Sequence, residues 1–156
     1  MDEKKSTEIV ISHVIKGIEI AKKHKLPKEI INFISTHHGT SRTEFFYRNY
    51  IKSHPDEDIS EEDFRYPGPK PLSKEMAVLM IVDSVEAASK SLKDPTAEEL
   101  NDLIEKIVEF KLKDGQFEKA NITIKEINTT KDVLKEYLSS IYHNRIKYPD
   151  EENQED

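Results

Sequence analysis

Apolar residues recur at three- and four-residue spacing along most of the chain, and this is the period of an amphipathic α-helix. The spacing predicts a first helix from Ser6 to about His24, with His13 at an inward-facing position. A second helix is expected over residues 27–38, because Pro27 suits a first helical turn and Gly39 suits a left-handed helix end.

The next segments differ sharply in polarity. The aromatic stretch RTEFFYRNYI is predicted to be a third helix, and it runs into a loop over residues 52–73 whose acidic residues and prolines oppose regular structure. Ser73 then begins another helix as its N-cap. The centre of that helix, MAVLMIVDSVEAA, is apolar nearly all round, so we expect it to be the buried middle of the fold.

Two more helices are expected in the C-terminal part of the chain. Thr96 and Glu99 have the spacing of a capping box in front of an apolar stripe, and residues 130–146 form an amphipathic closing helix. The segment ITIKEIN between these helices fits either a short strand or a helical turn. The sequence therefore predicts one all-α domain over residues 1–149, followed by an acidic, disordered tail over residues 150–156.

The composition narrows the classes of function. A length of 156 residues suits one domain, and a formal net charge of -7 argues against a surface that binds DNA. No cysteine occurs, so any metal must be held by His, Asp or Glu side chains. The chain has no segment like a signal peptide and no run of about 18 apolar residues that could span a bilayer, so we expect it to be soluble.

Four residues are candidate metal ligands: His13, His37, His38 and Asp83. Adjacent helical residues point about 100° apart, so His37 and His38 reach one centre only if the helix unwinds at Gly39. Otherwise one of them faces the core and the other caps the helix end. His13 also fits a packed core histidine, and Asp83 is costly to bury without a cation or a local partner. Together, three imidazoles and one carboxylate suit manganese, iron or zinc.

Four further side chains are candidates for binding a nucleotide. Arg65, Tyr66 and Lys70 lie in the proline-rich loop, where cationic groups suit phosphate and an aromatic ring suits a base. The alternative is a rigid surface connection stabilised by aromatic packing. Lys90 follows Asp83 by seven residues on one helical face, where it either reaches a phosphate or is an ordinary surface lysine. The remaining histidines are interpreted as surface residues: His24, His54 and His143.

Five stretches of the sequence together resemble a known family: ISHVIKGIEIAKKHKLPKEIINFISTHHGT, EEDFRYPGPKP, IVDSVEAASKSL, KLKDGQFEKANITIKEI and IYHNRIKYP. They are similar to the cytosolic HD domain of the seven-transmembrane HD family, the PgpH-type cyclic di-AMP phosphodiesterases, from about residue 6 to residue 149. The resemblance implies an all-helical HD-superfamily fold with a dinuclear iron or manganese centre that cleaves cyclic di-AMP to the linear dinucleotide. It also implies a cytoplasmic domain of a bacterial inner-membrane protein.

By this resemblance, His13, His37 and His38 would bind one metal, and Asp83 the other. The sequence contains no His-Asp dipeptide, whereas in the family the aspartate of that dipeptide bridges the metals. We therefore expect the chain to be the C-terminal portion of an HD domain from a longer membrane protein, truncated at its N-terminal side. In that state it would have partial or no metal occupancy and little activity, and its uncovered apolar surface would favour self-association.

Two alternatives remain open from the sequence. In the first, a degenerate HD module without catalytic activity binds a nucleotide or a protein partner, and the absence of the His-Asp dipeptide is native. In the second, the fold and the chemistry are kept, but the substrate is a nucleotide other than cyclic di-AMP.

Overall fold

The computed structural model describes residues 3–143, which are helical apart from loops and an isolated bridge between Arg42 and Arg65. Within this range, no helix has the length and apolarity needed to cross a bilayer. The tail predicted over residues 150–156 lies outside the described residues. The elements follow in the order α1 (Glu3–Lys23), α2 (Lys28–Thr36), α3 (Glu44–Ser53), the 3-10 helix η1 (Glu61–Phe64), α4 (Lys74–Ser89), α5 (Ala97–Lys113) and α6 (Ile124–His143). The prediction of an all-α fold is confirmed.

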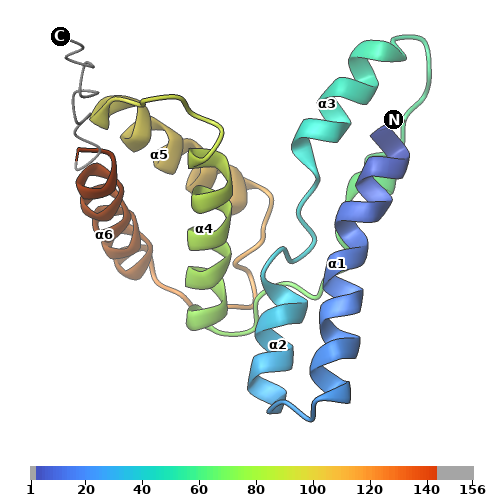
Figure 1. Cartoon of the computed structure of the whole chain (residues 1–156), viewed down its shortest axis with the longest axis horizontal. Helices are drawn as coiled ribbons and strands as arrows, with labels where there is room; N and C mark the ends of the chain where they lie inside the picture. Colours follow the sequence, from blue (N-terminus) through green and yellow to red (C-terminus); the bar gives the residue numbers. More distant parts are fainter. Residues whose placement is uncertain (1–2, 144–156) are drawn as a thin grey trace, which may run out of the picture.

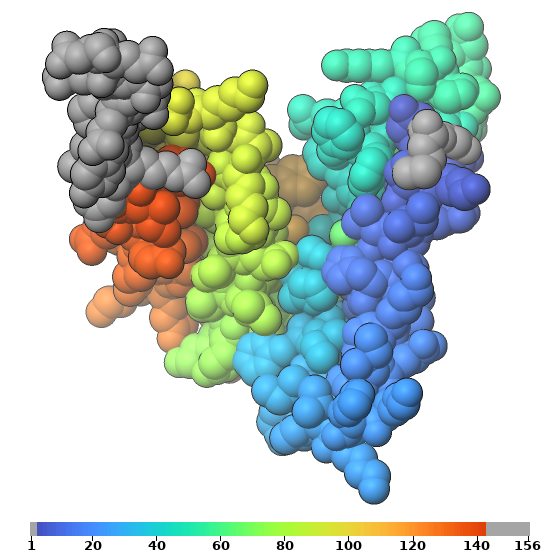
Figure 2. Space-filling view, in the orientation of Figure 1, coloured from blue at the N-terminus to red at the C-terminus, as the bar shows by residue number. Residues whose placement is uncertain are grey.

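The helices form two groups that meet at α2 and α4. The helices α4, α5 and α6 pack together on one side, and α1, α2 and α3 lie on the other (Figure 1). Because α2 contacts both α1 and α4, it joins the two groups. The space-filling view shows a V-shaped notch between α4 on one side and α1 and α3 on the other, with the end of α2 at its base (Figure 2).

The main core lies between α4, α5 and α6. The apolar stripe predicted for α5 packs against α4, and α6 covers both helices. Complete burial of one aliphatic side chain contributes about 1.5–3 kcal/mol, so this cluster is the main source of stability. Its buried members include Ala77, Met80, Ile81, Val85, Leu100, Ile104, Val108, Ile127, Leu134 and Leu138.

Both helices that complete this core begin with reciprocal caps. In α5, the predicted capping box is present, with Thr96 and Glu99 bonding each other's backbone N–H groups at 2.8 and 3.2 Å. In front of α6, the N–H of Thr123 donates to the carboxylate of Glu126 at 2.9 Å, and the N–H of Glu126 donates to the hydroxyl of Thr123 at 3.2 Å. The ITIKEIN segment therefore begins a helix and not a strand, and its Thr-x-x-Glu spacing is the signal that decides between them.

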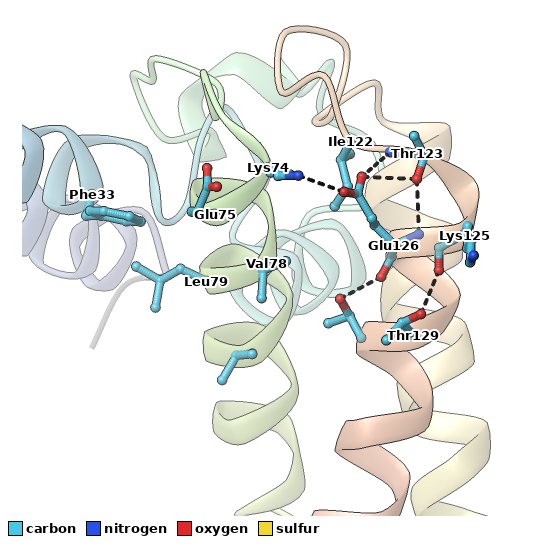
Figure 3. A pocket seen from close by; sticks show the side chains of 12 residues that line it. Phe33, Lys74, Glu75, Val78, Leu79, Ile122, Thr123, Lys125, Glu126 and Thr129 are labelled. Atoms are coloured by element: carbon cyan, nitrogen blue, oxygen red, sulfur yellow. Dashed lines mark hydrogen bonds and ion pairs between the residues drawn. The ribbon is translucent and has the colours of Figure 1, made fainter.

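One face of α4 is open, which corrects the expectation that this helix is buried nearly all round. Met80 and Ile81 are fully buried, but Leu79 and Val82 are 38% and 37% exposed. They line an apolar trough of about 830 Å³ between α4, α2 and the start of α6, and Phe33 of α2 faces them across it (Figure 3). One face of α4 packs on α5 and α6. Apolar residues on its opposite face are only partly covered and meet solvent.

Ile104→Ala should lower the free energy of unfolding by about 2–5 kcal/mol, because it leaves a cavity in the packed core. Ile104 is fully buried on α5, whereas Ile20 on α1 is 58% exposed. Ile20→Ala is therefore the control, with an expected change within about 0.5 kcal/mol. Urea unfolding followed by circular dichroism measures both variants, and equal losses in the two would contradict this placement of the core.

Candidate metal centre

The turn that follows α2 directs two neighbouring histidines to the base of the notch. His37 is the C-cap of α2, and its N–H donates to the carbonyl of Phe33 at 3.1 Å. Gly39 has a φ of 54°, in the left-handed region that glycine adopts without a steric penalty. The chain then reverses, and the N–H of Ser41 donates to the carbonyl of His38 at 3.0 Å. The helix therefore ends at Thr36, two residues before the predicted end at residue 38, and the predicted left-handed turn falls at Gly39.

Three imidazoles meet where α1 passes the end of α2. One ring nitrogen from each of His13, His37 and His38 lies within 4.8 Å of the other two, and Nε2 of His13 is 3.2 Å from Nε2 of His37. Both of these histidines contact a carbonyl of their own helix through Nδ1, His37 that of Ile34 at 2.7 Å and His13 that of Val10. A carbonyl at Nδ1 holds the ring proton there and leaves the Nε2 lone pair available to a metal. The donor set therefore fits a first-row divalent metal.

Two of the predicted ligands are more accessible than the sequence implies. His13 was expected to face inward, but it is an exposed residue with its ring against the other two histidines. Asp83 is also partly exposed, and its Oδ2 lies 3.6 Å from Nδ1 of His38. Asp83 is therefore a neighbour of His38 and not a member of the three-histidine group.

His38 is enclosed by Tyr66. The two rings stack with centroids 4.3 Å apart and planes inclined by 24°. Burial, together with the other two histidines and Lys111, lowers the pKa of His38 to about 3. Its imidazole is therefore neutral at physiological pH, and neutral imidazole is the form that binds metals. Burial and the charge of Asp83 raise the pKa of Tyr66 to about 12, so the phenol keeps its proton.

Gln116 holds the turn from the buried side. Its side chain accepts a hydrogen bond from the N–H of Thr40 at 3.0 Å and donates one to Oγ1 of the same residue at 3.0 Å. A Cβ atom at Gly39 would collide with Oε1 of Gln116 and lie 2.7 Å from Cε of Met80. Any other residue would be strained at this φ and would force the ends of both side chains to move. The sequence did not predict a role for Gln116, because a contact between residues so far apart in the chain leaves no local pattern.

Arg65 braces the same turn from the loop that precedes α4. Its guanidinium donates to both carboxylate oxygens of Asp114 at 3.1 and 3.2 Å and to the carbonyl of Thr40 at 2.9 Å. Burial acts to raise the pKa of Asp114, but the bonds from Arg65 and Gln116 outweigh it, and the net effect lowers this pKa. These contacts fix the loop by charged hydrogen bonds and not by the aromatic packing of the alternative that the sequence left open. Phosphate binding by Arg65 stays a prediction.

Of the four candidates for nucleotide binding, the structure places Tyr66 against the histidines. Lys70 forms an ion pair with Glu118 at 3.0 Å, and Lys90 forms one with Glu86 on the exposed side of α4. Neither lysine contacts the histidine cluster through a described interaction. Their binding of substrate stays a prediction.

The other histidines lie away from this cluster. His24, just after the end of α1, is exposed, as interpreted from the sequence. His54 is only half-buried, because its ring stacks on Tyr50 with a centroid distance of 4.2 Å. The side chain of His143 lies outside what the structure describes.

A buried cation that was not predicted from the sequence is hydrogen-bonded to the turn. Lys111 on α5 is 7% exposed, and its Nζ donates to Oγ of Ser41 at 2.8 Å. Burial lowers the pKa of Lys111 to about 8, against the attraction of Asp114 and Asp83, so the side chain is still mainly charged at pH 7. A lysine seven residues after Ile104, on the apolar stripe of α5, is the signal that could have revealed it.

The fold and the site define a class: a helical domain that gathers histidines from two helices and faces them with an aspartate from a third. The family model described as "HD domain" matches residues 1–88, which is more than half of the chain. The chain therefore belongs to the HD domain family. This family is metal-dependent, in agreement with a histidine cluster that fits a metal.

Two relatives align with most of this chain. The chain is 43% identical over 145 residues to the cyclic-di-AMP phosphodiesterase PgpH of Bacillus subtilis (strain 168). It is 42% identical over 148 residues to the protein of the same name from Listeria monocytogenes serotype 1/2a (strain 10403S). These matches cover 93% and 95% of this chain but 20% of each relative, so the chain spans about a fifth of the length of these proteins.

A solved structure has the same fold. The crystal structure of the L. monocytogenes phosphodiesterase PgpH HD domain in complex with cyclic-di-AMP matches with a TM-score of 0.87 and 40% sequence identity. The match covers 95% of this chain and 68% of that chain. The fold implied by the resemblance to the PgpH-type family is confirmed.

The pair Arg65 and Asp114 should show a favourable coupling energy of about 1–3 kcal/mol in a double-mutant cycle, because two parallel charged hydrogen bonds join them. The cycle uses Arg65→Met, Asp114→Asn and the double variant, with urea unfolding at neutral pH. The control is the exposed pair Lys113 and Glu109 on α5, whose side chains are 74% and 63% exposed. We expect a coupling below about 0.5 kcal/mol for the control, and an equally small value for Arg65 and Asp114 would contradict the bracing role.

Proposed function

We propose that the chain forms part of the catalytic domain of a metal-dependent phosphodiesterase that hydrolyses cyclic di-AMP to the linear dinucleotide. The observation that carries this proposal is the meeting of three imidazoles in a chain 40% identical to the PgpH HD domain that was solved with cyclic-di-AMP. In this proposal, His13, His37 and His38 hold one metal and Asp83 holds the second, and both metals are manganese or iron. The cyclic dinucleotide is the partner.

The residues of the chain prepare the site for this chemistry. Bound divalent metals supply an activated water and offset the charge that develops on a phosphoryl group. The carbonyls of Ile34 and Val10 orient His37 and His13, so that Nε2 of each ring faces the common centre. Tyr66 lies flat against His38 and restricts that ring to one orientation.

Four protein donors are too few to hold two metals in closed shells. We propose that the chain is the C-terminal portion of an HD domain, and that the remaining ligands, including the bridging aspartate, come from a segment that the PgpH HD domain has in addition. In the parent protein, the domain would lie on the cytoplasmic side of the bacterial membrane.

The open face of α4 supports this proposal. A second hollow of about 260 Å³ shares Phe33 and Leu79 with the apolar trough and is also lined by His37 and Asp83. Apolar surface thus runs along α4 to the edge of the candidate metal centre, where a covering segment could deliver ligands. Without that segment, the same surface favours self-association of the chain.

The chain should bind about one Mn²⁺, the partial occupancy expected of an incomplete site, and His37→Ala should weaken this binding at least about tenfold, because it removes one of three convergent nitrogens. Isothermal titration calorimetry with metal-free protein gives the stoichiometry and the affinity. His24→Ala is the matched control, because His24 is exposed and lies away from the cluster. Equal affinity in the His37→Ala variant and the unaltered chain would show that the metal binds elsewhere.

The chain alone should cleave cyclic di-AMP slowly or not at all in the presence of Mn²⁺, because the bridging carboxylate is absent. Chromatographic detection of the linear dinucleotide measures this rate. Robust turnover by a strictly monomeric preparation would contradict the incomplete site. Parallel binding titrations with cyclic di-AMP, cyclic di-GMP and AMP distinguish the proposed substrate from another nucleotide.

A further inference from the structure

Ser41 connects the enclosed part of the candidate site to α5. Its N–H donates to the carbonyl of His38 at 3.0 Å, and its own carbonyl accepts the N–H of Tyr66 at 3.0 Å. Tyr66 in turn stacks on the ring of His38, so Ser41, Tyr66 and His38 are linked to one another. The remaining group of Ser41, its hydroxyl, accepts the hydrogen bond from Lys111. The ammonium is therefore fixed to the same short turn that carries His38.

Lys111 is a costly residue to bury in this position. An ammonium group has three donors, and the structure gives it one hydrogen-bond partner among the described residues, the neutral hydroxyl of Ser41. No described carboxylate forms a salt bridge with it, although Asp83 and Asp114 attract it from further away. Removing a cation from water costs several kcal/mol unless close partners compensate it. The charge of Lys111 therefore does not serve the stability of the fold.

The charge does reach the candidate metal centre. Lys111 acts electrostatically on His38 and on Asp83, which are two of the proposed ligands. The C-terminal half of α5 lies at the back of the notch, where the low dielectric of the interior screens a charge weakly (Figure 2). A positive charge in this place has two opposite effects, because it repels a bound metal cation and attracts a phosphate anion.

We propose that Lys111 is a positioning residue for the phosphate of the substrate: hydrogen-bonded to Ser41 of the turn that carries His38, its ammonium strengthens the binding of a phosphate anion to the metal-loaded site while it weakens the binding of the metal. This inference deepens the proposed function and rests on it. The buried ammonium of Lys111 does not need to contact the substrate. It acts on the bound phosphate through its electric field, and its hydrogen bond to Ser41 holds it in place.

The test measures two affinities by isothermal titration calorimetry at pH 7: Mn²⁺ for the metal-free chain, and inorganic phosphate for the Mn²⁺-saturated chain. Lys111→Met is close to lysine in length and removes the charge, and Lys111→Gln removes the charge but keeps a donor for Ser41. Both variants should bind Mn²⁺ about three- to tenfold more tightly, and phosphate about three- to tenfold more weakly, than the unaltered chain. Lys113→Met is the control, because Lys113 lies on the same helix but is 74% exposed, and it should change neither affinity.

The opposite signs separate this role from a structural one. If Lys111 merely held the turn in shape, its loss would disorder His38 and weaken both affinities. The inference is overturned if both affinities fall together in the two variants, if neither affinity changes, or if Lys113→Met gives the same shifts. Thermal unfolding should show Lys111→Met to be at least as stable as the unaltered chain. If the Met variant does not fold, the two affinities are measured on Lys111→Gln instead.

Failure of the proposed function gives a different result. In that case His37→Ala would bind Mn²⁺ as tightly as the unaltered chain, and the inference about Lys111 would fall with it. If instead His37→Ala abolishes Mn²⁺ binding and the Lys111 variants do not show the opposite shifts, the metal centre stands and only the role of Lys111 is wrong.

Discussion

The close approach of the Gly39 backbone to Gln116 is the contact on which the candidate site depends. Just after α2 ends at Thr36, Gly39 at φ 54° turns the chain against Gln116 and Met80, where a Cβ atom would displace the ends of both side chains. Because the helix stops there, His38 leaves the helical direction and can join His37 on one side of the molecule. A side chain at Gly39 would be strained at this φ and would have to displace the ends of the Gln116 and Met80 side chains.

The turn is held by residues from distant parts of the chain, each of which satisfies a different group. Gln116 pairs with the backbone and the hydroxyl of Thr40, and Arg65 donates to the carbonyl of the same residue. Lys111 reaches Ser41 from α5. The apolar core between α4, α5 and α6 fixes the frame, and these polar contacts tie the histidine-bearing helices to it. A small polar network thus fixes the position of the turn that bears the histidines, while the apolar core contributes most of the free energy of folding.

The parts of this structure that the sequence predicted have local causes. Helical period, the caps at Ser73 and Thr96, and the glycine after the histidine pair each involve residues within one or two turns of each other. Periodicity also shows which face of a helix is apolar, but it cannot show whether another element covers that face. For this reason the exposure of Leu79 and Val82 on α4 was not predicted.

The candidate site shows the same division between local and distant causes. The histidine pair and the left-handed turn at Gly39 were predicted, because Gly39 follows the pair directly in the sequence, whereas the helix itself ends at Thr36, before the pair. The partners behind the turn were not predicted, because Gln116 is 76 residues from Thr40 and Lys111 is 70 residues from Ser41. The exposure of His13 was missed for a related reason, since the apolar period of α1 does not reveal the notch beside it.

Local charge, and not the charge of the whole chain, decides what the site attracts. The chain carries a formal net charge of -7, which by itself would repel a phosphodiester. Around the histidines, however, the pKa of His38 of about 3 keeps that ring neutral, and Lys111 places a positive charge near the one proposed carboxylate ligand, Asp83. The charge of a bound divalent metal is then not cancelled by the protein. Because salt screens exposed charges beyond about 8 Å, the acidic residues elsewhere on the surface have little effect on an anion at the base of the notch.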